Sequence, residues 1–258
     1  MQADIFSDPL LFSRLQTIEN YRDKFYLYAT TNLLGAAKLS DDELEYFLRQ
    51  FSLLQISFGG PTKDDYRSMF GVDVFDIVNK QLDRIHLMIQ KYKQPPTIHL
   101  YFRISDRLKL ENSREFANLS KKFIVREVRD SFFSWGGLIS QEDLPKGAIL
   151  LESGAQSMMD DCAAAWATLS VSPDGRVLGC GCVDWKNKHI IGNMHFSKIK
   201  EIWQSEDAQR FRRGFSEGNA PDMCRICALY TSANKCFRAN MANYKPSNGV
   251  YYNYNFAP

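Results

Sequence analysis

The sequence predicts an α/β fold, in which a parallel sheet with helical crossovers precedes a small, cysteine-rich region. Strand-like apolar runs alternate with amphipathic helical segments from Ala3 to Val128. Beyond about residue 150, short turn-rich segments replace this alternation. Five of the six cysteines then fall between positions 162 and 227. These observations predict a 1–150 α/β domain, a 151–240 metal-binding domain and a 241–258 tail.

The first domain is expected to contain four strands that follow the end of an earlier one. Ala3–Phe6 is interpreted as that strand end, and the four apolar runs cover residues 25–30, 53–58, 97–104 and 123–128. Helical spacing of apolar residues predicts helices near residues 10–18, 40–51, 75–89 and 116–119. Ser40 followed by Glu43 is a capping-box signature for the second of these helices.

The second domain is expected to contain a β-hairpin and helices. Residues 168–178 place a Ser-Pro-Asp-Gly turn between two short apolar runs. Such a hairpin would bring Cys162 and Cys180 close together at its open end. Helices are predicted from Ile199 and from Ser205, which is a favourable cap.

Composition excludes several classes of protein. The 258 residues carry 32 basic and 30 acidic side chains, and this balance implies no nucleic-acid partner. No run of 18 apolar residues indicates a membrane span, and the first residues lack the features of a secretory signal. We therefore expect a cytoplasmic protein whose thiols stay reduced and available to metals.

Polar residues near the ends of predicted strands are candidate ligand contacts. Ligands of parallel α/β sheets gather at the carboxyl ends of the strands. The candidates are Asp8, Asn32, Ser57 and Arg103. Asp8 and Asn32 are also common turn residues, Ser57 can simply end a strand, and Arg103 can pair with a nearby carboxylate.

Four cysteines have the spacing of one metal site: Cys162, Cys180, Cys224 and Cys227. The last two form a C-x2-C half-site. Four thiolates complete either a tetrahedral zinc site or a [4Fe–4S] cluster, and spacing alone leaves both open. With no free coordination position, such a site is structural or transfers electrons.

The remaining cysteines and the histidines are not expected to join this ligand set. Cys182 and Cys236 are interpreted as non-ligands, because six cysteines suffice for one four-cysteine cluster and not for two. His86 lies in a predicted helix and His99 in a predicted strand, which favours structural roles. His189 and His195 could lie near the site, but neither is spaced for metal binding with a second histidine.

Other residues accompany the cysteines at recognisable spacing. These are Trp166, Val171-Ser172-Pro173-Asp174-Gly175, Asp184, Ile191-Gly192-Asn193, Glu201-Ile202-Trp203 and Arg212. Together with the four cysteines they resemble the SPASM/twitch domain of radical S-adenosylmethionine (radical SAM) enzymes. The cysteine count is similar to that of the shorter twitch form, which implies one auxiliary [4Fe–4S] cluster instead of zinc.

The N-terminal half resembles the same family from the second strand of its barrel onward, which implies a partial (β/α)6 barrel. Ser7-Asp8-Pro9 is similar to a family segment that contacts the methionine amino group of S-adenosylmethionine, although both of that segment's glycines are replaced and Asp stands in place of Glu. The resemblance implies cofactor contacts from Ser57 and Arg103, with Asn32 as a neighbour.

One departure from the family is the absence of its C-x3-C-x2-C motif, which binds the cluster that cleaves the cofactor. A chain that is the C-terminal portion of a longer enzyme, or that has a misassigned start, would explain this absence. A chain that has lost radical chemistry is the alternative.

Two functions follow from the resemblance. A complete enzyme would abstract a hydrogen atom from a peptide or sugar-like substrate, with an electron donor such as flavodoxin or ferredoxin, and the auxiliary cluster would take up an electron or anchor the substrate. The alternative is a non-catalytic iron–sulfur module that does not cleave S-adenosylmethionine. A structural protein that is stabilised by a bound zinc ion is a third possibility.

Overall fold

The computed structural model describes residues 4–151, 161–181, 183–184 and 186–234. The chain divides into two compact units. Unit 1 comprises residues 1–132 and 139–151, and unit 2 comprises residues 133–138 and 152–258. The loop 133–138, which the sequence places in the first domain, is grouped with unit 2. Among the described residues, no helix is both long and apolar enough to cross a membrane.

Unit 1 is built on a four-stranded, fully parallel sheet of order β1-β2-β3-β4. The strands are β1 (Tyr28–Thr31), β2 (Leu53–Phe58), β3 (Thr97–Arg103) and β4 (Ile124–Arg129). Helical crossovers connect them, as expected for parallel neighbours. The α/β class and the parallel sheet predicted from the sequence are confirmed.

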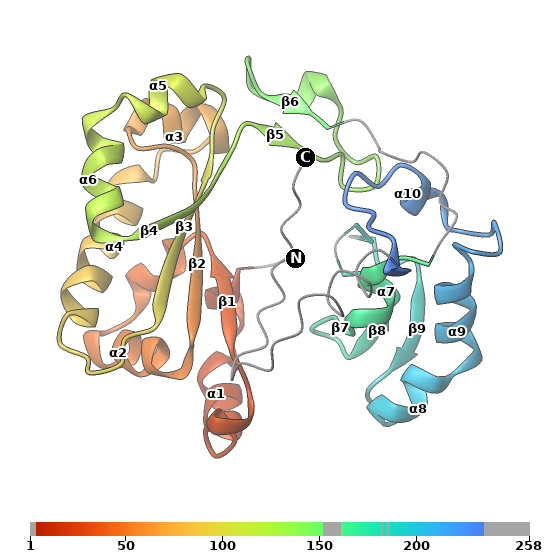
Figure 1. The fold of residues 1–258 in the computed structure, drawn as a ribbon. Coiled ribbons are helices and arrows are strands. Elements are labelled where there is room, and N and C mark those ends of the chain that lie inside the picture. The colour runs from red at the N-terminus through yellow and green to blue at the C-terminus, as the bar shows by residue number, and fades with distance from the viewer. Residues whose placement is uncertain (1–3, 152–160, 182, 185, 235–258) are drawn as a thin grey trace. The chain divides into compact units, whose positions relative to one another are not determined.

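The helices of unit 1 lie beside one face of this sheet (Figure 1). They are α1 (Leu11–Glu19), α2 (Asp41–Gln50), α3 (Lys63–Phe70), α4 (Phe75–Ile89), α5 (Arg107–Glu111) and α6 (Arg114–Lys122). Short 3-10 helices cover Ile5–Ser7 (η1), Arg22–Lys24 (η2), Leu34–Lys38 (η3) and Gln141–Asp143 (η4). A two-residue parallel pair, β5 (Ser131–Phe132) with β6 (Ile149–Leu150), follows the sheet.

Strict alternation of buried and half-buried residues orients the two central strands. Ile56 and Phe58 of β2 and Phe102 of β3 are fully buried on the helix-covered face. Phe58 is the centre of an aromatic cluster, with ring centroids 5.4 Å from Tyr66 and 5.6 Å from Phe102. The opposite face carries half-buried polar side chains: Thr30, Gln55, Ser57, His99, Tyr101 and Arg103.

The N-terminal strand predictions need correction. Ala3–Phe6 does not end a strand in its described part, because the Asp4 carboxylate accepts the Phe6 N–H and starts the 3-10 helix η1. The strand expected at 25–30 begins only at Tyr28. Phe25 follows η2, and ladder pairing with β2 starts where Tyr28 lies opposite Leu53.

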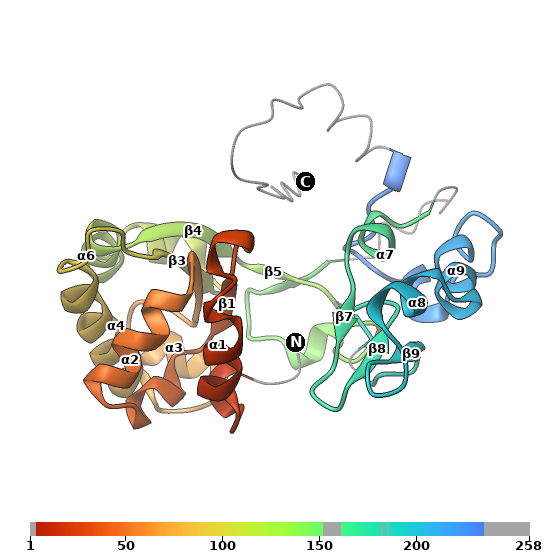
Figure 2. The ribbon, with the colours of Figure 1, turned by 90° about the horizontal axis from the view of Figure 1, so that it is seen from below.

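Unit 2 contains a three-stranded antiparallel sheet of order β7-β8-β9, with helices α8 and α9 beside β9 (Figure 2). Its elements are α7 (Ala163–Ala167), β7 (Ser170–Val171), β8 (Arg176–Leu178), β9 (Ile190–Asn193), α8 (Ile199–Gln204), α9 (Glu206–Arg213) and α10 (Asp222–Arg225). The predicted hairpin is β7–β8. Gly175 takes a φ of +80° in its turn and donates its N–H to the Ser172 carbonyl.

Candidate metal centre

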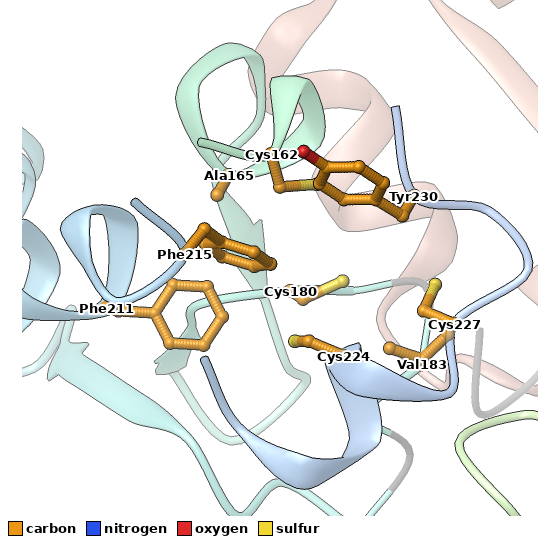
Figure 3. A pocket seen from close by; sticks show the side chains of 9 residues that line it. All are labelled: Cys162, Ala165, Cys180, Val183, Phe211, Phe215, Cys224, Cys227 and Tyr230. Atoms are coloured by element: carbon orange, nitrogen blue, oxygen red, sulfur yellow. The ribbon is translucent and has the colours of Figure 1, made fainter. Parts of the chain in front are cut away.

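Four cysteine side chains from three separate segments line one small pocket in unit 2 (Figure 3). They are Cys162, Cys180, Cys224 and Cys227, the set selected by spacing. The pocket has a volume of about 20 Å³. Its remaining walls are Ala165, Val183, Phe211, Phe215 and Tyr230.

Local structure brings each cysteine to the pocket. Cys162 precedes α7 and forms an isolated antiparallel bridge with Ser232, so the chain that follows the C-x2-C turn returns alongside Cys162. Cys180 lies two residues beyond β8. Cys224 belongs to the one-turn helix α10, and the Cys227 N–H donates to the Cys224 carbonyl at 3.1 Å. The C-x2-C spacing therefore places both of its sulfurs on one side of a tight turn.

Burial raises the pKa of three of these thiols. The pKa of Cys227 rises to about 11, and the pKa values of Cys162 and Cys224 also rise, with desolvation as the main cause in each case. Backbone N–H groups of Ala164, Ala165 and Thr231 hydrogen-bond to Cys162 and oppose its shift. Without a metal, these three thiols are thus neutral at pH 7, and a bound metal must displace their protons.

The donor set fits a thiolate-ligated group. The pocket lining contains neither imidazole nor carboxylate, and soft thiolate ligands select zinc, copper(I) and iron–sulfur clusters. Within the described ranges, no three or more His, Cys, Asp or Glu side chains are grouped to hold a single metal ion. In an iron–sulfur cluster, by contrast, each thiolate binds a different iron atom, so the four sulfurs surround the whole cluster.

Asp184 supports the pocket in a way that the spacing of cysteines does not reveal. Its carboxylate is buried and accepts the backbone N–H groups of Lys188 at 2.8 Å and His189 at 2.7 Å. It therefore closes the loop between Cys180 and β9. Its negative charge also contributes to the raised pKa of Cys224.

The two histidines considered as candidates do not line this pocket, and the predictions for the two remaining cysteines are not tested. Cys182 and Cys236 lie outside the described residues. The ring of His189 lies 6.0 Å from the ring of Phe211, whereas the His195 ring lies 6.5 Å from that of Phe196. Neither histidine is among the residues that line the pocket.

Two of the four predicted cofactor contacts share the polar face of the unit 1 sheet. Ser57 lies opposite Tyr101 in the β2–β3 register, and Arg103 follows two residues later on β3. Both Ser57 and Arg103 are half-buried on this face. Since neighbouring parallel strands present opposed residues on the same side, the register brings these two predictions to one surface.

The other two, Asp8 and Asn32, are both engaged in local turns. The Asp8 carboxylate accepts the Leu10 N–H at 2.9 Å and pairs with Arg14 at 3.3 Å. The Asn32 side chain accepts the Leu34 N–H at 3.0 Å. Aspartate and asparagine side chains commonly accept backbone N–H groups in turns in this way.

Sequence reasoning did not single out Asp4, which joins the chain start to the end of β1. Its Oδ2 atom accepts the Thr31 hydroxyl at 2.8 Å and the Asn32 N–H at 2.7 Å. A carboxylate just before a turn carries no sequence signal for such a distant contact. Its partners follow only from the fold.

Comparison with known proteins identifies the cysteine region. Residues 162–228 match the model of the SPASM iron–sulfur cluster-binding domain. No curated protein sequence gives a significant match.

Solved structures with a similar fold include three radical SAM enzymes. SuiB from Streptococcus suis, bound to its precursor peptide SuiA, is 11% identical, and the alignment covers 91% of this chain and 61% of SuiB, with a TM-score of 0.53. BtrN in complex with AdoMet and 2-DOIA is 15% identical over 88% of this chain and 82% of its own, with a TM-score of 0.44. Native anSMEcpe with bound AdoMet is 15% identical over 86% of this chain and 72% of its own, also with a TM-score of 0.44.

Of these three structures, SuiB has a TM-score above 0.5, and the fold assignment relies on it. Residues 162–228 therefore match a SPASM iron–sulfur cluster-binding domain, in a chain that shares its fold with SuiB.

Proposed function

We propose that this chain binds one auxiliary [4Fe–4S] cluster through Cys162, Cys180, Cys224 and Cys227. The observation that carries the proposal is the convergence of these four thiols, from three segments, on one pocket inside the SPASM match. With four candidate ligands, the SPASM region would be of the twitch form expected from the sequence. A reducing cytosol would keep these thiols available.

The residues around the thiols would shield the bound group. Phe211, Phe215 and Tyr230 line the same pocket, and the rings of Phe215 and Tyr230 are stacked 6.2 Å apart. Low solvent exposure and N–H···S hydrogen bonds are the means by which proteins set the potential of such a cluster. When bound, the cluster supplies one-electron transfer.

We further propose that the polar sheet face of unit 1 serves S-adenosylmethionine and a substrate. Ser57 and Arg103 supply hydroxyl and guanidinium groups on neighbouring strands of that face. Parallel sheets are ordinarily covered on both faces, so a polar, half-buried face is suited to a bound molecule. Asp8 and Asn32 would shape its rim.

The reaction proposed for this fold is a radical oxidation or modification of a peptide or a sugar-like molecule. BtrN and anSMEcpe are described with AdoMet, and SuiB with a precursor peptide. An electron donor such as flavodoxin or ferredoxin would be the protein partner. The cofactors would do the radical chemistry, and the protein would orient the substrate and exclude water.

A second candidate is favoured by the missing C-x3-C-x2-C motif. Without that motif, this polypeptide alone acts as a non-catalytic iron–sulfur module. A cleavage assay separates the two candidates. The module alone yields no 5′-deoxyadenosine from S-adenosylmethionine under reducing conditions, and 5′-deoxyadenosine formation would show that this chain is catalytic as it stands.

The cluster itself is tested by anaerobic reconstitution. We expect four iron and four sulfide per chain and a reduced state that is active in electron paramagnetic resonance. Cys224→Ala should lose most of the iron, because it removes one of the four ligands. A zinc-containing, iron-free protein after anaerobic purification would refute the cluster assignment.

A further inference from the structure

Arg212 of α9 is a buried cation in unit 2. Its side chain is only 4% exposed. The guanidinium carbon lies 4.8 Å from the ring centroid of Trp166 and 4.4 Å from that of Trp203. One guanidinium nitrogen, Nη2, donates to the Trp203 carbonyl at 2.6 Å. The cation thus contacts two indole rings.

No carboxylate pairs with Arg212 among the residues that the structure describes. Its Nε atom is buried there without a hydrogen-bond partner, and burial lowers the pKa of the guanidinium. By contrast, Arg176 pairs with Asp174, and Arg213 of the same helix with Glu217. An isolated buried charge is strongly unfavourable, and two cation–π contacts offset that cost only partly.

The cation belongs to α9 and contacts α7, and both helices supply walls of the thiol pocket. Phe211, its neighbour on α9, lines the pocket, as does Ala165, the neighbour of Trp166 on α7. The carboxylate of Asp161 also lies in this region, where it accepts hydrogen bonds from Trp166 Nε1 at 3.1 Å and from Ser216 at 2.7 Å. Arg212 therefore joins two of the helices that form the pocket.

Four thiolates leave a cubane cluster with net negative charge in both of its usual oxidation states. We infer that Arg212 is the fixed countercharge of the cluster, and that its buried positive charge raises the cluster's reduction potential. This inference rests on the proposed cluster. It explains why the domain keeps a cation with no carboxylate partner, since the anion that compensates it is the occupied site.

The competing explanation is that Arg212 only holds α7, α8 and α9 together by packing, a role that we call a latch. The two explanations differ in whether charge or shape matters. A countercharge acts on the reduced, more negative state of the cluster more than on the oxidised state. A latch affects folding without favouring either oxidation state.

The first test compares midpoint potentials of reconstituted full-length protein and three variants by redox titration monitored with electron paramagnetic resonance. Arg212→Met removes the charge and keeps the length, Arg212→Lys keeps the charge, and Arg213→Met removes an exposed charge from the same helix. We expect Arg212→Met to shift the reduction equilibrium at least tenfold toward the oxidised cluster, which is about 59 mV for one electron. Arg212→Lys should move it by much less, and Arg213→Met hardly at all.

Equal potentials for Arg212→Met and Arg213→Met would overturn the inference. If the wild-type chain takes up no cluster, the proposed function fails first. A loaded wild type whose potential is insensitive to Arg212→Met rejects the countercharge alone.

A second measurement covers the case of poor cluster loading by Arg212→Met. Thermal unfolding is compared for metal-free and reconstituted forms. A countercharge predicts that metal-free Arg212→Met is at least as stable as the metal-free wild type, and that its stability gain on loading is smaller. An equal loss of stability in both forms, or failure of the metal-free variant to fold where the wild type folds, assigns Arg212 to the latch and overturns the inference.

Discussion

At the scale of single residues, the polar face of the unit 1 sheet shows how position on a strand decides a role. Thr30, Gln55 and His99 lie opposite one another on three neighbouring strands, and the Thr30 hydroxyl donates to Gln55 Oε1 at 3.0 Å. Sequence analysis treated these residues as members of apolar strand runs. The signal for their position on the polar face was alternation within each run. Buried and half-buried residues alternate along both β2 and β3.

His99 is predicted to titrate below the ordinary range of a histidine. Burial lowers its pKa first, and the positive charge of Arg126 lowers it further. A lowered folded-state pKa means that the neutral ring stabilises the fold above the unfolded pKa of about 6.5, and that this stability is lost as the pH falls through the folded pKa.

Proton NMR of the imidazole resonances, assigned with His99→Gln, should therefore give a midpoint below 6.5 for His99. Loss of stability below that pH should be smaller in His99→Gln than in the wild type. A midpoint above 6.5 would contradict the burial argument.

At the scale of secondary structure, the start of α2 follows directly from local sequence. Ser40 Oγ accepts the Glu43 N–H at 3.2 Å, and Glu43 Oε2 accepts the Ser40 N–H at 2.8 Å. Ser40→Ala should lower the free energy of unfolding of unit 1 by about 1 kcal/mol, because the Glu43 N–H loses its acceptor. Chemical denaturation followed by circular dichroism measures it. Ser120→Ala is the control, since Ser120 is exposed inside α6 and should change stability by less than about 0.5 kcal/mol.

Not every element of unit 1 was predictable in this way. The capping box marked α2, but α3 was missed because Lys63–Phe70 is polar and buries only Tyr66. Its one clear signal is Thr62, whose hydroxyl accepts the Asp65 N–H at 3.2 Å. Amphipathic periodicity identifies helices with a broad apolar face, whereas a helix anchored by a single tyrosine lacks that pattern.

The Ile191-Gly192-Asn193 segment is an element of unit 2 whose glycine has a packing role. A Cβ atom at Gly192 would lie 2.5 Å from Cγ2 of Ile202, so β9 contacts α8 at a distance that only glycine permits. Gly192→Ala should therefore lower the stability of unit 2 by about 1–3 kcal/mol.

The double variant Gly192→Ala with Ile202→Ala tests whether this contact is the cause. Its loss of stability should be smaller than the sum of the two single losses, because the second change removes the atoms that clash. Additive losses would mean that the glycine is required for another reason. Thermal unfolding followed by tryptophan fluorescence provides the measurement.

At the scale of the whole molecule, the sequence predicted the ligands of the candidate site better than their surroundings. C-x2-C spacing and the hairpin before Cys180 are local signals, and the four cysteines they selected do line one pocket. Arg212, by contrast, contacts the ring of Trp166, which lies far away in the sequence. Such contacts arise only when the segments pack together, so a single sequence could mark these residues by resemblance but could not assign their roles.

The division into two units makes a last prediction about unfolding. Each unit has its own buried core, and all four tryptophans (Trp135, Trp166, Trp185 and Trp203) fall in unit 2. Tryptophan fluorescence should therefore follow the unfolding of unit 2 alone, whereas circular dichroism reports on both units.

A group that binds only the folded state raises stability by mass action. Iron removal should therefore lower the unfolding temperature seen by fluorescence and leave the unfolding temperature of unit 1 unchanged. Ser40→Ala should do the reverse, because its cap belongs to unit 1. Coincident transitions by both probes, shifted equally by iron removal and by Ser40→Ala, would show that the two units unfold as one.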